Sequence, residues 1–425
     1  MTTQLDLSQV ISNPSCMDDY DPNSMPVAKA RQFIKQFLSP VIATEALPIR
    51  QSLGRVVAAD ILSPTNVPNY DNSAMDGYAF NAVDIVKSTE LKVIGTSFAG
   101  KAFDGGIQSG ECVRIMTGGM MPKGTDTVIV QERVNIDGDS IRFTEAPKPK
   151  ANVRYAGEDL QLGKIVLPRG HMMRAADLGL IASLGIGEVS VFRQLKVAFF
   201  STGDELASIG EHLQEGQVYD SNRYTLYGML KRLGVEIIDM GAIADEPELL
   251  EKTLLNGAKQ ADVIITSGGV SVGEADYMKQ LLAKHGQVMF WKIAMKPGRP
   301  LAYGKIGVAH YFGLPGNPVA VMVTFYQFVR EAMLVLMGQT NPAPLPTFNV
   351  ICTENIKKQK GRTEFQRGIL FADSDGVWKV KPTGAQGSAI LSSMSLASCF
   401  IILDETVGNL EAGAMVQVQL LDGIV

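Results

Sequence analysis

The spacing of apolar residues changes several times along the chain, and each spacing predicts a different kind of element. From 27 to 37 apolar and charged residues alternate at helical spacing, and Pro40 stops the helix. We expect a second helix at 49–58. Between 70 and 150, short β-branched runs alternate with Gly and Asp turns, at 91–94, 112–115, 127–131 and 140–143, with a hairpin turn at 137–139. The spacing therefore predicts a β domain that interrupts a mixed helical and extended one.

From residue 196 the pattern becomes an alternation of strands and helices. The apolar run at 197–200 shows no alternation, as in a strand that is covered on both sides, and further strands are expected at 235–240 and 263–266. Helical spacing follows at 223–233, 247–259 and 277–285, and 319–337 is a long apolar helix. This order predicts a doubly wound parallel sheet. After a proline-rich linker at 341–346, short strands between Gly turns predict a small all-β domain.

Length and pattern together predict a multidomain α/β protein, because 425 residues exceed what one ordinary core accommodates. We expect a loose tail at 1–25, a mixed N-terminal α/β domain, an inserted β domain, a doubly wound α/β domain and a small C-terminal β domain. Their expected bounds are 26–69 with 151–192, then 70–150, 193–340 and 345–425.

Composition narrows the class of protein. Hydrophobic residues make up 46% and charged residues 20%, which is typical of a soluble globular chain. The net charge of −5 and the lack of a basic stripe argue against nucleic-acid binding. We find no apolar run long enough to span a bilayer and no signal-peptide pattern in the polar, acidic first residues. Four scattered cysteines and four histidines give no disulfide or zinc pattern, so we expect a cytoplasmic protein without a membrane partner.

The strongest chemical signal is ADVIITSGGVSVGEADY at 261–277, where a buried strand enters a Gly-rich loop. Loop N–H groups there can form an anion cradle, and we expect phosphate to bind at Ser267, Gly268, Gly269, Ser271 and Gly273. Glu274 and Asp276 place two hard oxygen ligands beside this loop, which suits Mg²⁺. The alternative interpretation is a tight turn with a capping Asp.

A second strand end, VAFFSTGDEL at 197–206, carries similar chemistry. Thr202 and Gly203 are candidate phosphate-binding residues, and Glu205 adds another carboxylate. Because ligands bind beyond the carboxyl ends of strands in open α/β sheets, we expect both strand ends to border one crevice. The alternative is an N-cap Asp followed by a surface Glu.

Candidate cations and hydroxyls occur in three other motifs. FWKIAMKPGRP at 290–300 offers Lys292, Lys296 and Arg299, although such lysines also occur on a solvated edge. GRTEFQRG at 361–368 and GAQGSAILSSMS at 384–395 offer oxyanion ligands, namely Arg362, Arg367, Ser388 and Ser392. GLPGNPVAV at 313–321 fits a loop that opens a helix, and simple capping explains it as well.

The stretch DNSAMDGYA at 71–79 gathers acceptors in one turn-rich segment, as Asx turns do. No G-x-x-x-x-G-K-[ST], no G-x-G-x-x-G after a strand and no G-x-S-x-G occurs in the sequence. A P-loop NTPase, a nicotinamide-dependent dehydrogenase and an α/β-hydrolase are therefore disfavoured.

Taken in order, DNSAMDGYA, RIMTGGMMP, NVR…GED, STGDEL, SGGVSVGEADY, KPGRP and GLPGNPV closely resemble the molybdopterin molybdenumtransferases. That family includes the bacterial MoeA type and the Cnx and gephyrin E domains, and the resemblance covers about residues 27 to 425. It implies four domains and an elongated homodimer, with a cleft between the α/β domain of one subunit and the domains of the other. It implies a transferase that combines adenylylated molybdopterin with molybdate to form molybdenum cofactor and AMP, assisted by Mg²⁺ or a similar divalent ion.

The resemblance also implies roles for single residues. Catalytic positions are Asp76, Thr117, Asp159, Glu205, Asp276, Lys292 and Lys296. Pro315 and Pro318 belong to the substrate-binding PGNP motif; molybdate would bind Lys296, Arg367 and Ser392, and the metal would bind Glu205, Glu274 and Asp276. One departure is Tyr155–Ala156, where many relatives carry basic residues after NVR.

The resemblance further implies contact with the upstream adenylyltransferase and with downstream molybdoenzyme chaperones. Two alternatives stay open at this point. One is the adenylyltransferase step itself, because that enzyme has a similar phosphate loop. The other is a scaffold without activity, since gephyrin relatives also cluster receptors.

Overall fold

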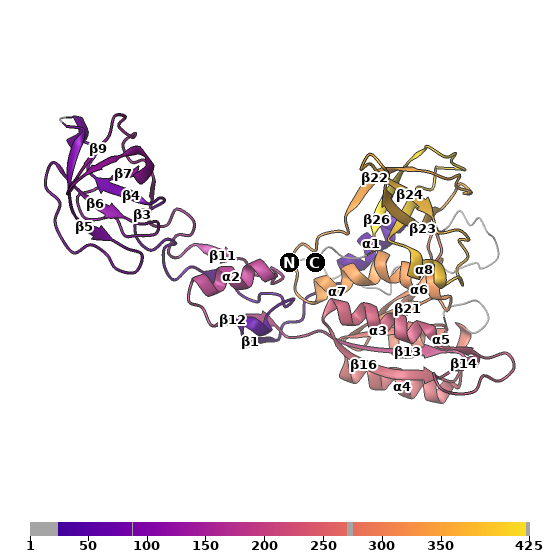
Figure 1. Cartoon of the computed structure of the whole chain (residues 1–425). Coiled ribbons are helices and arrows are strands. Elements are labelled where there is room, and N and C mark those ends of the chain that lie inside the picture. Colours follow the sequence, from indigo (N-terminus) through magenta and orange to yellow (C-terminus); the bar gives the residue numbers. More distant parts are fainter. Residues whose placement is uncertain (1–23, 87, 270–274, 422–425) are drawn as a thin grey trace. The chain divides into compact units, whose positions relative to one another are not determined.

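The computed structural model describes residues 24–86, 88–269 and 275–421 (Figure 1). These residues divide into two compact units. Unit 2 consists of Ala46–Leu53 and Ala59–Ser190, and unit 1 contains the described residues up to Glu45, Gly54–Ala58 and the chain from Val191 onward.

Unit 2 contains a six-stranded sheet, in the order β7-β4-β6-β5-β9-β8. Its strands are β4 (Gly77–Phe80), β5 (Glu90–Ser97), β6 (Glu111–Ile115), β7 (Thr127–Val130), β8 (Asn135–Asp137) and β9 (Ser140–Arg142). Asp137 pairs with Ser140 across a tight turn, which confirms the predicted hairpin. One face buries Tyr78, Phe80 and Leu91 together with other apolar side chains, so the sheet has its own core.

The rest of unit 2 consists of short elements outside this sheet. Two-stranded sheets join β3 (Asn72–Ser73) to β10 (Val153–Arg154) and β2 (Ile61–Leu62) to β11 (Ile165–Leu167). One α-helix, α2, spans Ala175–Ser183, and a further two-stranded sheet joins β1 (Thr44–Pro48) to β12 (Glu188–Phe192). Short 3-10 turns lie at Asp84–Val86 and Gln131–Arg133.

The predicted helix at 49–58 is wrong. Only Ile49–Gln51 is helical, as a single 3-10 turn. Gly54 then takes a φ of +74°, which an α-helix does not continue through. Val57 is fully buried and forms an extended bridge with Val191, as β-branched side chains prefer.

Unit 1 contains an α/β domain around the sheet β16-β13-β17-β21-β20-β18. Its strands are β13 (Lys196–Thr202), β16 (Glu236–Ile243), β17 (Val263–Ser267), β18 (Gly286–Lys292), β20 (Pro300–Ile306) and β21 (Ala309–Leu314), and a small parallel pair joins β14 (Leu206–Ala207) to β15 (Val218–Tyr219). The first three and β21 are parallel, as predicted, whereas β20 and β18 add an antiparallel edge that the sequence pattern did not indicate.

Helices cover both faces of this sheet. Leu250 and Leu254 of α4 (Pro247–Gln260) pack with Leu282 of α5 (Ala275–His285) on one face. The helix α3 (Ser221–Leu233) contacts β13, β16 and α6 (Pro318–Thr324). From β13 the chain passes through α3 to β16, and then through α4 back to β17 on the other side of β13. The strand order therefore reverses next to β13, which is where an open sheet leaves a crevice at its carboxyl edge.

The long apolar helix is continuous but not uniform. It runs through α6, a π-helical turn at Phe325–Val329 and α7 (Arg330–Leu336). At 19 residues and a mean hydropathy of 1.6 in its most apolar window, it is long enough to cross a membrane, so our expectation that no run reaches that length is wrong. Of that window, 72% is buried within the fold, as in a core helix. Gln327 ties it to its surroundings: it accepts from Arg31 of α1 (Val27–Gln36) and donates to Gln419.

The C-terminal part of unit 1 is a closed β-barrel. Its strands are β22 (Thr347–Cys352), β23 (Thr363–Ala372), β24 (Trp378–Pro382), β25 (Cys399–Leu403) and β26 (Met415–Leu420), and α8 (Ser392–Leu396) lies between β24 and β25 in the chain. The barrel closes because β23 pairs with both β24 and β25. A two-residue strand, β19 (Met295–Lys296), leaves the α/β domain and pairs with the start of β23. This pairing ties the Lys296 segment to the barrel.

Candidate active site

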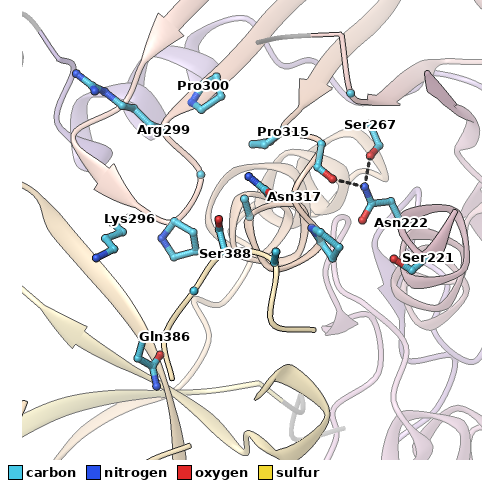
Figure 2. Close-up of a pocket in the computed structure, with 18 of the residues that line it drawn as sticks. Ser221, Asn222, Ser267, Lys296, Arg299, Pro300, Pro315, Asn317, Gln386 and Ser388 are labelled. Carbon is cyan, nitrogen blue, oxygen red and sulfur yellow. Dashed lines mark hydrogen bonds between the residues drawn. The ribbon is translucent and has the colours of Figure 1, made fainter. Parts of the chain in front are cut away.

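A cavity of about 1370 Å³ lies inside unit 1 (Figure 2). One side is formed by the ends of the parallel strands, through Thr202, Ser267 and Pro315. The other side is formed by barrel segments, including Gln386 and Ser388. The cavity therefore occupies the crevice that the strand order opens, with the barrel as its second wall.

The loops after β13 and β17 approach each other closely at this cavity. Gly268 has a φ of +92°, and a Cβ atom there would lie 2.5 Å from the carbonyl oxygen of Thr202. Only glycine combines that backbone conformation with so short a separation. At Gly203, which has a φ of +147°, a Cβ atom would instead lie 2.5 Å from a carboxylate oxygen of Glu205, the movable end of a side chain.

The structure thus brings together most of the predicted strand-end residues. The cavity lining includes Thr202, Glu205, Ser267, Gly268, Gly269, Lys296, Pro315 and Pro318. Gly203 lies beside them in the chain. Ser271, Gly273 and Glu274 lie outside the described residues, and so does the side chain of Asp276, which belongs to α5.

Positive charge gathers on the barrel side of the cavity and next to it. The basic residues of the described lining are Lys296, Arg299, Lys357 and Arg362. Lys296 is held by the parallel pairing of β19 with β23, opposite Glu364, and a cis peptide bond joins it to Pro297. Figure 2 shows Lys296 on the same side as Gln386 and Ser388, away from Asn222. A dianion that enters the cavity would be attracted to this side.

Lys292 has a different position from Lys296. It is the last residue of β18, where it is paired with Pro300, and its carbonyl oxygen accepts a hydrogen bond of 2.8 Å from the Met25 N–H. It does not appear among the described residues that line the cavity. The structure therefore separates the two lysines that sequence spacing grouped.

Arg367 does not occupy the position we expected for an oxyanion ligand. It is only 1% exposed, and burial lowers the pKa of its guanidinium to about 10. Its Nε donates to Ser393 Oγ at 2.9 Å, and its NH2 group donates to the Gly387 carbonyl at 2.9 Å. Arg367 therefore holds the 384–388 segment in place through the Gly387 carbonyl. Most residues of that segment line the cavity, whereas Arg367 itself does not.

The structure also separates Ser392, our candidate molybdate ligand, from Ser388. Ser392 starts α8 and is absent from the described cavity lining, whereas Ser388 belongs to it. The Ser388 carbonyl accepts a hydrogen bond from Val319 N–H at the start of α6, which fixes the loop against the α/β domain. Sequence spacing alone could not separate these two serines, because both follow the same Gly-rich turn.

Three predicted residues belong to unit 2. Thr117 donates to Asp76 Oδ1 twice, from its backbone N–H and its hydroxyl, both at 2.8 Å. The backbone hydrogen bond from Thr117, and to a smaller extent its hydroxyl, hold the pKa of the half-buried Asp76 carboxyl below its usual value. Asp159 is exposed on a turn where its N–H donates to Val67 O. Asp76 and Thr117 therefore form a preorganised pair.

Sequence reasoning missed the acceptors at the start of α3. Asp220 caps this helix by accepting from Arg223 N–H, and Asn222 Nδ2 donates to Ser267 Oγ at 2.8 Å and to the Gly316 carbonyl at 2.7 Å (Figure 2). Both residues line the cavity. The signal was the DSN triplet before a helix, which by itself indicates only a cap. Within the described residues, no group of three His, Cys, Asp or Glu side chains is placed to hold a metal ion.

Comparison with known proteins agrees with this architecture. Family models match the MoeA N-terminal region (domain I and II) at 25–185, a probable molybdopterin binding domain at 198–334 and the MoeA C-terminal region (domain IV) at 349–421. The chain is 48% identical to the molybdopterin molybdenumtransferase of Haemophilus influenzae, over 88% of this chain and 93% of that protein. It is 38% identical to the Nostoc molybdopterin molybdenumtransferase, over 85% of each.

A solved structure supports the fold directly. The molybdopterin biosynthesis moeA protein of Pyrococcus horikoshii matches with a TM-score of 0.81 and 28% identity, over 94% of this chain and all of that one. Fold and site together define a multidomain transferase with an α/β domain of the molybdopterin-binding type. The chain belongs to the MoeA family of molybdopterin molybdenumtransferases, in molybdenum cofactor biosynthesis.

Proposed function

We propose that the cavity inserts molybdate into adenylylated molybdopterin, forming molybdenum cofactor and releasing AMP. One observation carries this proposal: glycine loops after two parallel strands and Lys296 line a single cavity. Such loops suit the phosphates of a pyrophosphate-linked nucleotide, and the lysine suits a small dianion. The family names of the relatives agree with this reaction.

Electrostatics explains the arrangement. Molybdate and the phosphoanhydride are both anionic, so bringing them together costs repulsion. Lys296 would hold molybdate on the barrel side, and loop N–H groups at Gly268 and Gly269 would hold phosphate on the strand side. Arg367 would contribute by keeping the 384–388 segment in place. The dithiolene sulfurs, which are soft ligands, would then bind molybdenum.

A divalent ion such as Mg²⁺ fits part of this chemistry. Glu205 presents a hard carboxylate oxygen at the cavity, next to the loops that would hold phosphate. We propose that Glu205, with Glu274 and Asp276, would hold the ion, which would withdraw charge from the bridging phosphates. Asp76, Thr117, Asp159 and Lys292 remain candidate catalytic residues.

We also propose a cytoplasmic homodimer that takes its substrate from an adenylyltransferase and passes its product to molybdoenzyme chaperones. The location is supported by the scattered cysteines, and the dimer and the protein partners are supported by the family resemblance.

The reaction is tested by mixing the purified protein with adenylylated molybdopterin, molybdate and Mg²⁺. We expect stoichiometric AMP release and a product that activates a cofactor-free molybdoenzyme. Glu205→Gln should lose both, while Glu215→Gln, an exposed glutamate outside the described lining, should keep both. Formation of adenylylated pterin from ATP and molybdopterin would instead indicate the adenylyltransferase. Full cofactor synthesis by Glu205→Gln would contradict the assignment of this carboxylate.

A further inference from the structure

Three buried oxygens at one end of the cavity have no hydrogen-bond partner among the residues that the structure describes. They are Thr202 Oγ1, Asp220 Oδ2 and Asn222 Oδ1. Their residues are 5%, 4% and 8% exposed, and all three line the cavity. A buried acceptor without a donor costs free energy of folding, so such groups usually have a partner in the working state.

The orientation of Asn222 is fixed by its own bonds. Its Nδ2 donates to Ser267 Oγ and to the Gly316 carbonyl, and the carbonyl, which can only accept, requires the amide nitrogen on that side. The amide oxygen must therefore point the other way, as Figure 2 shows. Asn222 lines the cavity, and its amide oxygen is an acceptor without a donor among the described residues.

Asp220 is fixed in the same manner. Its Oδ1 accepts from Ser201 Oγ and from the Arg223 backbone N–H, each at 3.1 Å. These two bonds hold the carboxylate at the start of α3 and leave Oδ2 without a donor among the described residues. Asp220 and Asn222 therefore present two acceptors, one of them anionic, at the same helix end.

Resting on the proposed function, we propose that Asp220 and Asn222 recognise the 2-amino and N3–H edge of the pterin ring. This edge carries two neighbouring donors, which match a carboxylate oxygen and an amide oxygen. The acceptors lie on the strand and α3 side, while Lys296 lies on the barrel side. The anionic groups of the same substrate would then extend toward the cations.

Adenine is the other possible source of an amino group in this substrate. Its N6 amino group stands next to N1, which is an acceptor, so adenine offers one donor where the pterin edge offers two. A second acceptor opposite N1 would be repelled. The pair of acceptors therefore favours the pterin, and Thr202 Oγ1, which can donate or accept, suits either ring.

The test compares two ligands that differ at one group. Pterin-6-carboxylate carries the 2-amino donor, and lumazine-6-carboxylate carries a 2-oxo acceptor in its place. We expect the wild-type protein to bind the pterin about tenfold or more tightly than the lumazine, measured by quenching of ligand fluorescence. Asp220→Asn keeps the Oδ1 cap and puts an NH₂ donor where Oδ2 stands, so its preference should reverse.

Asp126→Asn is the matched control. Asp126 Oδ1 also accepts from a backbone N–H, that of Ala82, and from a hydroxyl, that of Thr127, but it belongs to unit 2 and is not in the described lining. This variant should keep the wild-type preference. Circular dichroism melting of each variant shows whether it is folded.

Several results would overturn the inference. One is an equal pterin-to-lumazine ratio in folded wild type and Asp220→Asn; another is failure of the wild type to bind the pterin at millimolar concentration. Weaker AMP binding by Asp220→Asn with an unchanged pterin-to-lumazine ratio would assign the acceptors to adenine instead. The molybdenum-insertion assay separates the two proposals. If the wild type inserts molybdenum but does not prefer the pterin over the lumazine, only this inference is wrong. If the wild type does not insert molybdenum, the proposed function is wrong.

Discussion

Replacing Gly268 by alanine tests the close approach of the two strand-end loops. The residue has a φ of +92°, and a left-handed conformation costs a non-glycine residue about 1–2 kcal/mol. The new Cβ would also lie 2.5 Å from the Thr202 carbonyl oxygen, and relieving such overpacking adds about 1–3 kcal/mol. The reduced entropy of the unfolded alanine chain offsets about 0.4–1 kcal/mol. We therefore expect a net destabilisation of about 1–5 kcal/mol.

Gly234→Ala provides the matched control. Gly234 ends α3 with a φ of +73°, but no atom lies within 4 Å of its would-be Cβ. Gly234→Ala should cost only the conformational part, about 0–2 kcal/mol after the entropy offset. The difference between the two variants measures the contact between the loops.

The assay is thermal and urea unfolding of both variants, with molybdenum insertion measured in parallel. Gly268→Ala should unfold several degrees below Gly234→Ala and lose most of its turnover, because relief of the clash moves the loop away from Thr202. Gly234→Ala should retain turnover. Equal stability of the two variants, with full activity in Gly268→Ala, would refute the idea that the site needs this approach.

Three further perturbations test single groups. Glu205→Gln should lose roughly 3 kcal/mol of transition-state stabilisation, so turnover should fall about a hundredfold. Its melting temperature should stay near that of the wild type. A matched loss of stability would point to a structural role instead. Burial lowers the pKa of His310 to about 4 from 6.5, so the unfolded chain takes up a proton first and stability falls as the pH drops from 6.5 toward 4, by about 3 kcal/mol at the lower limit. Urea unfolding across this range should show a flatter profile for His310→Gln, and an equally steep one would remove His310 as the cause. Burial raises the pKa of Cys112 and Cys399 to about 12, and Cys352 is also buried. A Cys16→Ser variant retains only these three thiols, so it should react with a thiol reagent only after unfolding. Rapid labelling of the native variant would contradict this.

The local sequence was sufficient to predict buried strands, glycine loops and a hairpin, because each depends mainly on residues close together in the chain. The strands at β13 and β17 were predictable because apolar runs without a polar face must be covered on both sides. The glycines after them indicated loops that can approach an anion, and the order of strands and helices indicated where the sheet would open. By the same reasoning the hairpin at β8 and β9 followed from its turn residues.

Contacts between distant segments were decided only by the tertiary structure. Whether Arg367 binds a ligand or supports a loop depends on Ser393 and Gly387, which barrel closure brings to it. Ser388 reaches the cavity and Ser392 does not, because one belongs to the loop held by Val319 and the other begins α8. In the sequence, Asp220 and Asn222 indicate only a helix cap. Their oxygens without partners can be identified only when the other hydrogen bonds of both side chains are known. Periodicity reports which face of an element is buried, whereas the identity of the atoms that meet there depends on how the chain packs against itself.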